Sequence, residues 1–130
     1  MTRPVLVDTS AWVDFLRPGD SPVDDLIPHL VRSGHARLCG PVLCELLQGV
    51  RSPRQATRLQ DLLRALSYIE DDRSDWLAAG YTLQHLRRGG ITVPLSDALI
   101  ATLAIRRALD VLTLDQHFRH FELRLIPIDG

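Results

Sequence analysis

The feature that most constrains the fold is an alternation of short apolar runs with stretches of helical periodicity. The run Val5-Leu6-Val7 has no polar alternation, which is typical of a strand that is buried on both faces. Repeated strand–helix–strand order favours a parallel sheet covered by helices. We therefore predict an α/β fold with strands over residues 5–7, 36–39, 67–69, 111–114 and 123–126.

Between these runs the apolar spacing predicts helices, several of which have clear start signals. We expect them over 9–16, from Ser21-Pro22 to Ser33-Gly34, from Pro41, from Ser52-Pro53, over about 72–88, and from a cap at Ser96. The helix that follows Ser96 is apolar nearly all round, which is typical of a buried helix. A short helix is expected around 116–121.

Size and composition are those of one ordinary globular domain spanning residues 1–130. No apolar run approaches the roughly 20 residues that a bilayer requires, so we expect no membrane association. The segment Met1–Val5 lacks the features of a signal peptide, which favours a cytoplasmic location. Cys39 and Cys44 have no further cysteine or nearby histidine with which to form a zinc site, so we expect buried free thiols.

Four acidic residues occupy positions at which they can share one crevice. Asp8 follows the first strand and Asp115 follows the fourth. Sites in parallel α/β sheets form beyond the carboxyl ends of the strands, where the strand order reverses. If these two strands are neighbours there, the two carboxylates share one crevice. Asp97 lies in the first turn of the buried helix, where the helix dipole favours an ionised carboxylate. Glu45 lies off the centre of its helix's apolar stripe, which lets it project into a cavity.

Each of these residues alone also has a purely structural interpretation. Asp8 and Asp115 can cap the helices that follow them. Asp97 can stabilise its own helix N-terminus, and Glu45 can be a solvated surface charge. The combination of all four favours a site.

The motifs around these acids resemble those of the PIN-domain family, specifically the VapC-type ribonuclease toxins of bacterial toxin–antitoxin pairs. The resemblance covers nearly the whole chain. Its segments, in order, are Val7-Asp8-Thr9-Ser10-Ala11-Trp12, Leu43-Cys44-Glu45-Leu46, Leu95-Ser96-Asp97-Ala98-Leu99-Ile100-Ala101 and Leu112-Thr113-Leu114-Asp115-Gln116-His117-Phe118. The resemblance implies a five-stranded parallel sheet sandwiched between helices, and an endoribonuclease that hydrolyses RNA with metal-activated water.

Carboxylates gathered in one crevice repel one another, and a hard divalent cation relieves that repulsion. Mg²⁺ or Mn²⁺ fits such a site better than zinc, which favours His and Cys. The resemblance implies that Asp8 and Asp97 are direct ligands and that Glu45 and Asp115 complete the metal and catalytic set. Thr9, Ser10 and Thr113 are candidates to hold these carboxylates in place, although a plain role as caps or turn hydroxyls is equally consistent with the sequence.

Partners are implied as well. Leu-rich stripes over Pro41–Leu66, with the amphipathic helix near Val23–Leu30, predict more apolar surface than a small domain covers. The resemblance implies that a cognate antitoxin covers it and reaches the acidic crevice with a basic side chain. RNA is the implied substrate, and self-association as a homodimer is expected. The competing interpretation is that these leucines pack on the sheet and on each other.

Two other functions compete with the ribonuclease. A haloacid dehalogenase-type phosphatase also places an Asp after its first strand, but it needs a second Asp where Ser10 stands, and it commonly uses a Lys, which this chain lacks. A non-catalytic module of the same fold would usually have lost an acidic residue.

Some further residues have two interpretations each. We expect His117 and His120 to be surface histidines. Trp12 can stack on a base or be buried, and the pairs Arg87-Arg88 and Arg106-Arg107 can contact phosphates or end solvated helices.

Overall fold

The chain forms a parallel sheet flanked by helices, as predicted; the structure, a computed structural model, describes residues 3–128. The strands are β1 (Val5–Val7), β2 (Ala36–Cys39), β3 (Ser67–Ile69) and β4 (Asp110–Leu112). Their order in the sheet is β3-β2-β1-β4, and each neighbouring pair is parallel. β1 and β4 are buried along their whole length, because helices cover both faces of the sheet there.

The expected fifth strand is reduced to a single bridge. Leu125 pairs in parallel with Val111, and the amide of Ile126 donates to the Val111 carbonyl at 2.9 Å. The sheet therefore has four strands with one additional bridge at the β4 edge, rather than five full strands. A short edge partner of this kind is common in natural sheets.

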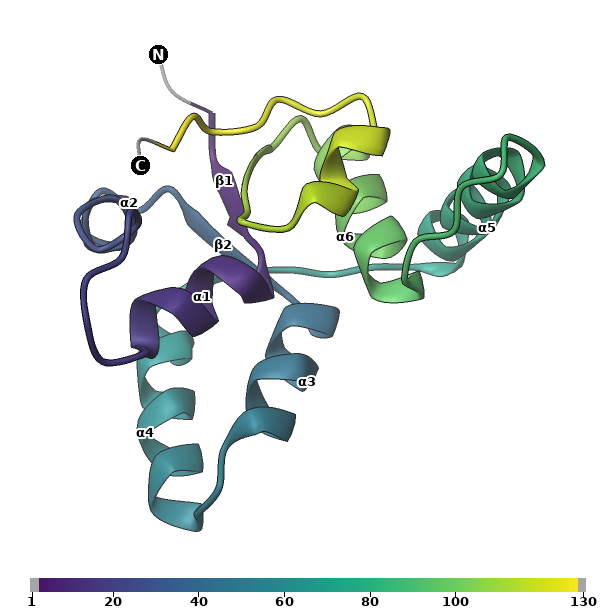
Figure 1. Cartoon of the computed structure of the whole chain (residues 1–130). Coiled ribbons are helices and arrows are strands. Elements are labelled where there is room, and N and C mark those ends of the chain that lie inside the picture. Colours follow the sequence, from purple (N-terminus) through teal and green to yellow (C-terminus); the bar gives the residue numbers. More distant parts are fainter. Residues whose placement is uncertain (1–2, 129–130) are drawn as a thin grey trace.

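The helices follow the predicted order (Figure 1). They are α1 (Thr9–Leu16), α2 (Leu26–Arg32), α3 (Gly40–Gly49), α4 (Pro53–Arg64), α5 (Arg73–Arg88), α6 (Leu95–Arg106) and the short 3₁₀ helix η1 (Gln116–His120).

Two helix starts differ from the prediction for local reasons. α2 begins at Leu26 rather than near Ser21, because the Ser21 amide donates to Asp24 at 2.8 Å and forms a turn instead. α6 begins at Leu95 with Pro94 as its cap residue. The hydroxyl of Ser96 is therefore inside the helix and does not cap it.

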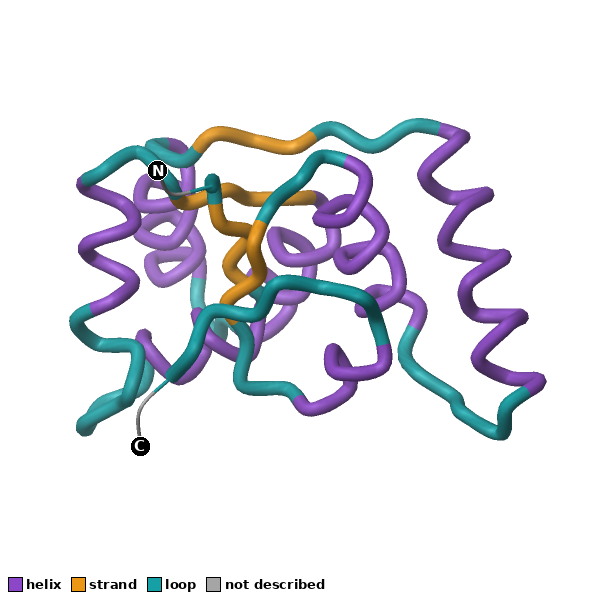
Figure 2. Tube along the Cα trace, turned by 90° about the horizontal axis from the view of Figure 1, so that it is seen from above, coloured by secondary structure: helices purple, strands orange, loops and turns teal. Residues whose placement is uncertain are grey.

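α6 is the central helix of the molecule. Every residue from Asp97 to Ala104 is buried, and the helix packs against β4, α3, η1 and α5. Figure 2 shows α5 at the outer edge of the molecule.

Trp12 is fully buried and packs edge-on against Phe15. Of the two interpretations of this residue, base stacking and burial, the structure supports burial.

The remaining sequence expectations on burial are partly corrected. Cys39 is buried as expected, but Cys44 is exposed on the solvent side of α3. The apolar residues of the α2 region, Val23, Ile27 and Leu30, are buried in the core and do not form an exposed stripe. Across residues 3–128, none of the helices has the length and apolar character that a membrane span would need.

Candidate active site

The site begins where β1 and β4 end side by side. Val7 pairs with Leu112, and the Asp8 amide donates to the Leu112 carbonyl at 2.9 Å. The condition for a shared crevice, that these two strands are neighbours, is therefore met. β4 ends earlier than predicted, so Thr113 and Leu114 separate it from Asp115, which caps η1.

Asp8 is held at the start of α1 by hydroxyl groups. Its Oδ2 accepts hydrogen bonds of 2.8 Å from Ser10 and 2.8 Å from Thr113, and its side chain is the N-cap of α1. The Ser10 hydroxyl in turn accepts from the amide of Leu114 at 2.9 Å. These bonds join the loop after β4 to the first turn of α1. Asp8 thus acts as a helix cap and also faces the other acids.

Asp97 lies in the first turn of α6 and is only 6% exposed. Burial raises the pKa of its carboxyl from 3.8 to about 6, and the negative charges of Asp115 and Asp8 add to that rise. His117 acts in the opposite direction. Three acidic residues predicted from the sequence therefore influence one another across a short distance.

His117 is a functional candidate that the sequence analysis did not include in the site. Its Nδ1 lies 3.3 Å from Oδ2 of Asp97 and 3.2 Å from Oδ1 of Asp115. The side chain is 47% exposed, so the expected surface position is correct, but its contacts are with the acidic residues. Its position two residues after Asp115, in the turn that Asp115 caps, was the only sequence signal for this contact. Within residues 3–128, His120 makes no such contact.

Glu45 joins the group through hydroxyl groups. Thr9 donates to its Oε1 at 2.8 Å, and Ser96 donates to its Oε2 at 3.5 Å. These two residues directly adjoin Asp8 and Asp97 in sequence. The half-buried Glu45 therefore lies on the α3 side of the same crevice.

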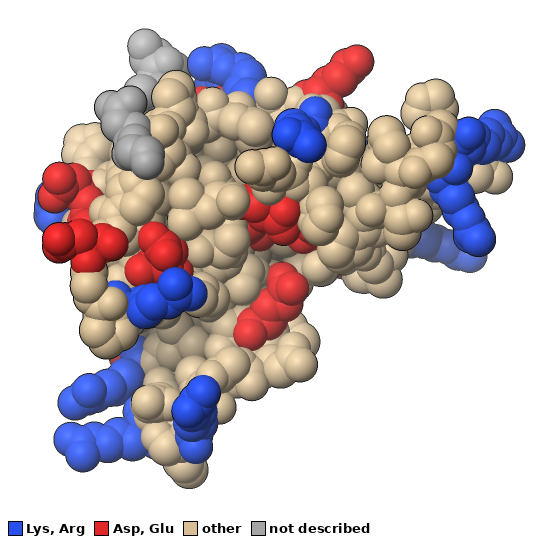
Figure 3. Space-filling view, viewed as in Figure 1, with Lys and Arg blue, Asp and Glu red and all other residues tan. Residues whose placement is uncertain are grey.

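The site is strongly acidic. Figure 3 shows acidic side chains in the middle of one face, with most arginines toward the periphery. Among the described residues, only His117 has a basic side chain within ion-pair distance of any of the four carboxylates, and its imidazole carries a charge only when protonated. Arg106 and Arg107 instead bind Asp75, at 2.9 and 2.7 Å, so this arginine pair ties α6 to α5.

The residues present fit a divalent cation. Ligand atoms of Asp97, Asp115 and His117 all lie within 4.8 Å of one another. The pKa of Asp97 is raised by burial first and then by the negative charges of Asp115 and Asp8, and a cation at this position would relieve the repulsion among these carboxylates. Oxygen donors dominate the set, which is what hard divalent ions prefer.

Comparison with known proteins identifies the family of the chain. The family model of the PIN domain matches residues 5–123. The chain belongs to the PIN-domain family.

Among curated PIN-domain relatives, ribonuclease VapC11 of Mycobacterium tuberculosis and a VapC ribonuclease of Mycobacterium bovis are each 35% identical over 118 residues, which is 88% of either chain. Solved structures share the PIN fold at lower identity. The VapBC complex of Salmonella typhimurium bound to DNA has a TM-score of 0.81 at 18% identity, covering 96% of this chain and 98% of that one. VapBC2 of Rickettsia felis, bound to a promoter DNA fragment, has a TM-score of 0.80 at 21% identity with the same coverage.

Proposed function

We propose that this PIN-domain chain is a metal-dependent endoribonuclease and the toxin of a toxin–antitoxin pair. The observation that carries the proposal is the convergence of Asp8, Asp97 and Asp115 at the β1–β4 edge, with Glu45 across the crevice. The ribonuclease names of relatives that match 88% of the chain support the choice of RNA as substrate. A cytoplasmic location is part of the same proposal, because the proposed substrate, cellular RNA, is found in the cytoplasm.

In this proposal Asp8 and Asp97 hold Mg²⁺ or Mn²⁺ directly, and Glu45 and Asp115 complete the catalytic set. A divalent ion held there would lower the pKa of a water molecule bound to it and would stabilise the charge that develops on the phosphodiester. Ser10 and Thr113 restrict the Asp8 carboxylate to one orientation, because both hydroxyls donate to the same oxygen. Thr9 does the same for Glu45.

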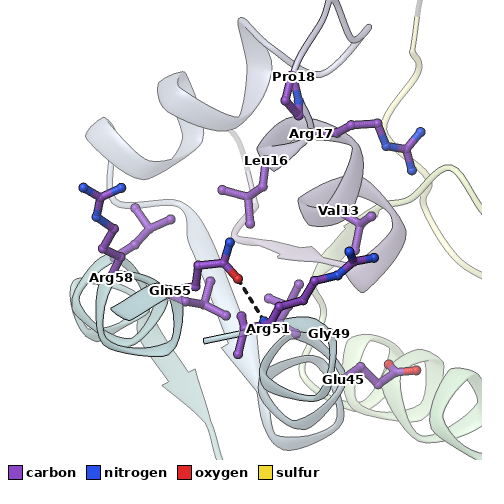
Figure 4. A pocket seen from close by; sticks show the side chains of 13 residues that line it. Val13, Leu16, Arg17, Pro18, Glu45, Gly49, Arg51, Gln55 and Arg58 are labelled. Atoms are coloured by element: carbon purple, nitrogen blue, oxygen red, sulfur yellow. Dashed lines mark hydrogen bonds between the residues drawn. The ribbon is translucent and has the colours of Figure 1, made fainter. Parts of the chain in front are cut away.

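The antitoxin has a groove to occupy. A cavity of about 730 Å³ lies between α1, α3 and α4 (Figure 4). Its apolar lining comprises Val13, Leu16, Leu46, Val50, Leu59 and Leu62. Val13 and Leu16 are 43% and 47% exposed, so this apolar surface is available to a partner segment. Leu46 of α3 and Leu59 of α4, which belong to the predicted leucine stripes, line the groove but are only 5% and 7% exposed, so Val13 and Leu16 of α1 are the more exposed part of this lining.

Charge along the groove suits such a segment. Glu45 lines one end and also belongs to the acidic crevice, so a segment lying in the groove can reach the crevice with a basic side chain. Arg17, Arg51 and Arg58 line other parts of it, where acidic groups of the segment would pair with them. The apolar lining between them would bury an amphipathic helix.

Homodimer formation is also part of the proposal. Trp76, Leu77 and Tyr81 on α5 are 46%, 60% and 63% exposed, which leaves a second apolar surface away from the groove. Antiparallel pairing of two α5 helices would bring Arg87 and Arg88 of one copy toward Asp71 and Asp72 of the other. Light scattering measures the molar mass of the protein in solution and tests this pairing. The unmodified chain should have the mass of a dimer, and Leu77→Asp that of a monomer.

The test of the nuclease is cleavage of total RNA with Mg²⁺ or Mn²⁺ by Asp8→Asn and Asp97→Asn proteins. Each amide keeps the volume of the side chain and removes the charge that an ion needs, so cleavage should be abolished in a folded protein. Asp61→Asn is the matched control, because Asp61 lies 65% exposed in a surface ion pair. Unchanged cleavage by folded Asp97→Asn would contradict the proposal.

The same samples separate the alternatives. A phosphatase of haloacid dehalogenase type would hydrolyse p-nitrophenyl phosphate and leave RNA intact. A non-catalytic module would do neither. The position at which that phosphatase needs a second Asp holds Ser10, whose hydroxyl is bonded to Asp8.

A further inference from the structure

Among the described residues, His117 is the basic side chain that contacts the carboxylates of the crevice. Its imidazole lies between Asp97 and Asp115, and the atom facing both carboxylates is Nδ1. An imidazole nitrogen is one of the commonest metal-ligand atoms in proteins. Its placement therefore bears on which ion the site retains.

The distances suit ligand atoms around one ion. Nδ1 of His117 is 3.3 Å from Asp97 Oδ2 and 3.2 Å from Asp115 Oδ1. Adjacent ligands of an octahedral ion at about 2.1 Å lie roughly 3.0 Å from each other. Nδ1 of His117 thus lies close to this spacing from each of the two carboxylate oxygens, and ligand atoms of all three residues lie within 4.8 Å of one another.

The position of the imidazole is built into η1. The backbone amide of His117 donates to Asp115 Oδ1 at 2.9 Å, which fixes the turn that carries the ring. The next residue, Phe118, is fully buried and anchors η1 to the core. The ring itself is 47% exposed, so solvent and a substrate can still approach on its open side.

We propose that His117 is a metal ligand through Nδ1, together with Asp97 and Asp115, and that it makes the site retain Mn²⁺ and Co²⁺ in preference to Mg²⁺. This inference rests on the proposed function, since it concerns the ion of that same site. Mg²⁺ prefers oxygen ligands and binds imidazole poorly, whereas first-row transition ions accept nitrogen readily. One imidazole among carboxylates therefore shifts selectivity without changing the rest of the site.

The competing interpretation is that His117 is only a counter-charge for the two carboxylates and leaves when an ion enters. The two interpretations differ in a measurable way. A ligand nitrogen contributes a ¹⁴N coupling to bound Mn²⁺, whereas a displaced imidazole contributes none.

The experiment uses the full chain stripped with EDTA and then titrated separately with Mn²⁺, Co²⁺ and Mg²⁺. Affinities are measured by calorimetry, and Mn²⁺-loaded samples are examined by pulsed electron paramagnetic resonance. The variant is His117→Gln, and the matched control is His120→Gln, three residues further along the chain and without contact to the carboxylates. Circular dichroism checks that each variant is folded, and the ¹⁴N measurement on the unmodified chain requires no variant.

We expect the unmodified chain to show a ¹⁴N coupling that His117→Gln loses and His120→Gln keeps. Affinity of His117→Gln for Mn²⁺ and Co²⁺ should fall about tenfold or more, with a clearly smaller change for Mg²⁺. Mn²⁺ binding without a ¹⁴N coupling, or with one that persists in His117→Gln, overturns this inference and leaves the nuclease proposal intact. Failure of the unmodified chain to bind any of the three ions overturns both.

Discussion

Thr113 donates a hydrogen bond of 2.8 Å to Oδ2 of Asp8, across 105 residues of sequence. The same oxygen accepts from Ser10, and the Thr113 hydroxyl also accepts from the Asp115 amide at 2.9 Å. One hydroxyl group therefore connects the acids that follow β1 and β4. Its removal should affect the orientation of both carboxylates.

The first prediction follows from that bond. Thr113→Val keeps the shape of the side chain and removes the donor, so divalent-ion affinity and RNA cleavage should each fall about tenfold or more. Calorimetry with Mn²⁺ and a cleavage assay provide the measurements. Thr57→Val is the control, because the Thr57 hydroxyl donates within α4, to the Pro53 carbonyl, and has no contact with the acidic site among the described residues. Equal ion affinity for Thr113→Val and the unmodified chain would show that the bond does not prepare the site.

A second prediction concerns the pH dependence of stability in the absence of metal. The pKa of Asp97 is raised from 3.8 to about 6 by burial and by Asp115 and Asp8, with His117 opposing. Between these two pH values the folded chain binds more protons than the unfolded chain, so this group lowers the free energy of unfolding as pH rises. Asp97→Asn removes that loss. The free energy of unfolding of Asp97→Asn should equal that of the unmodified chain near pH 4 and exceed it increasingly toward pH 6. Above pH 6 this difference should remain constant, at up to about 3 kcal/mol.

Urea unfolding in EDTA at pH 4, 5, 6 and 7 measures this difference, with Asp61→Asn as the exposed control. Added Mg²⁺ or Mn²⁺ should raise the melting temperature of the unmodified chain and have much less effect on Asp97→Asn. A stability difference that is the same at all four pH values would contradict the raised pKa.

The third prediction concerns the attachment of α5 to α6. Asp75 is 1% exposed and accepts hydrogen bonds of 2.9 and 2.7 Å from Arg107, whose guanidinium holds the pKa of Asp75 at about 2. Arg107→Leu leaves this buried carboxylate with Arg106 as its remaining cationic partner within residues 3–128. The free energy of unfolding at pH 7 should therefore fall by about 1.5–3 kcal/mol, the contribution of hydrogen bonds to a charged group.

The sign of the pH effect follows from the lowered pKa. The stabilisation is present above the ordinary Asp value and is lost as pH falls toward 2, so the difference between Arg107→Leu and the unmodified chain should narrow at pH 3. Denaturant unfolding at pH 7 and pH 3 gives both values. Arg64→Leu removes an exposed pair of 3.9 Å and should change stability little at either pH. An equally small effect of Arg107→Leu would indicate that the Asp75 pair does not secure α5.

The fourth prediction concerns the groove between α1, α3 and α4. Leu16→Asp places a charge on an apolar side chain that is 47% exposed and lines the groove. Affinity for the protein encoded immediately upstream should fall about tenfold or more, because the partner helix would have to bury that charge. Co-purification and calorimetry measure it. Leu77→Asp, on an exposed part of α5 outside the groove, should bind that partner normally; a loss of binding only in Leu77→Asp would relocate the antitoxin to α5.

Sequence periodicity determined the fold class, because burial of a strand or a helix face depends on side chains close together in the chain. The runs at β1 and β2 and the apolar α6 were recognisable for this reason. The four acidic residues were candidates because each follows a strand or lies in a helix, but their prediction as one site came from their combination and from the resemblance to the PIN-domain family. The same local signals placed α2 too early, because Ser21 and Asp24 form a competing turn that periodicity does not register.

Only the tertiary structure decided which distant segments meet. Burial of α6 raises the pKa of Asp97, and the pairing of β4 beside β1 brings Asp8 and Asp115 close enough to add to that rise. The contact of His117 with two carboxylates depends on the conformation of η1. The groove exists because the packing of α1, α3 and α4 leaves a space between these helices. Local patterns specify which faces are buried, but strand order and helix packing set the distances between groups far apart in sequence, and those distances determine charge interactions and ligand geometry.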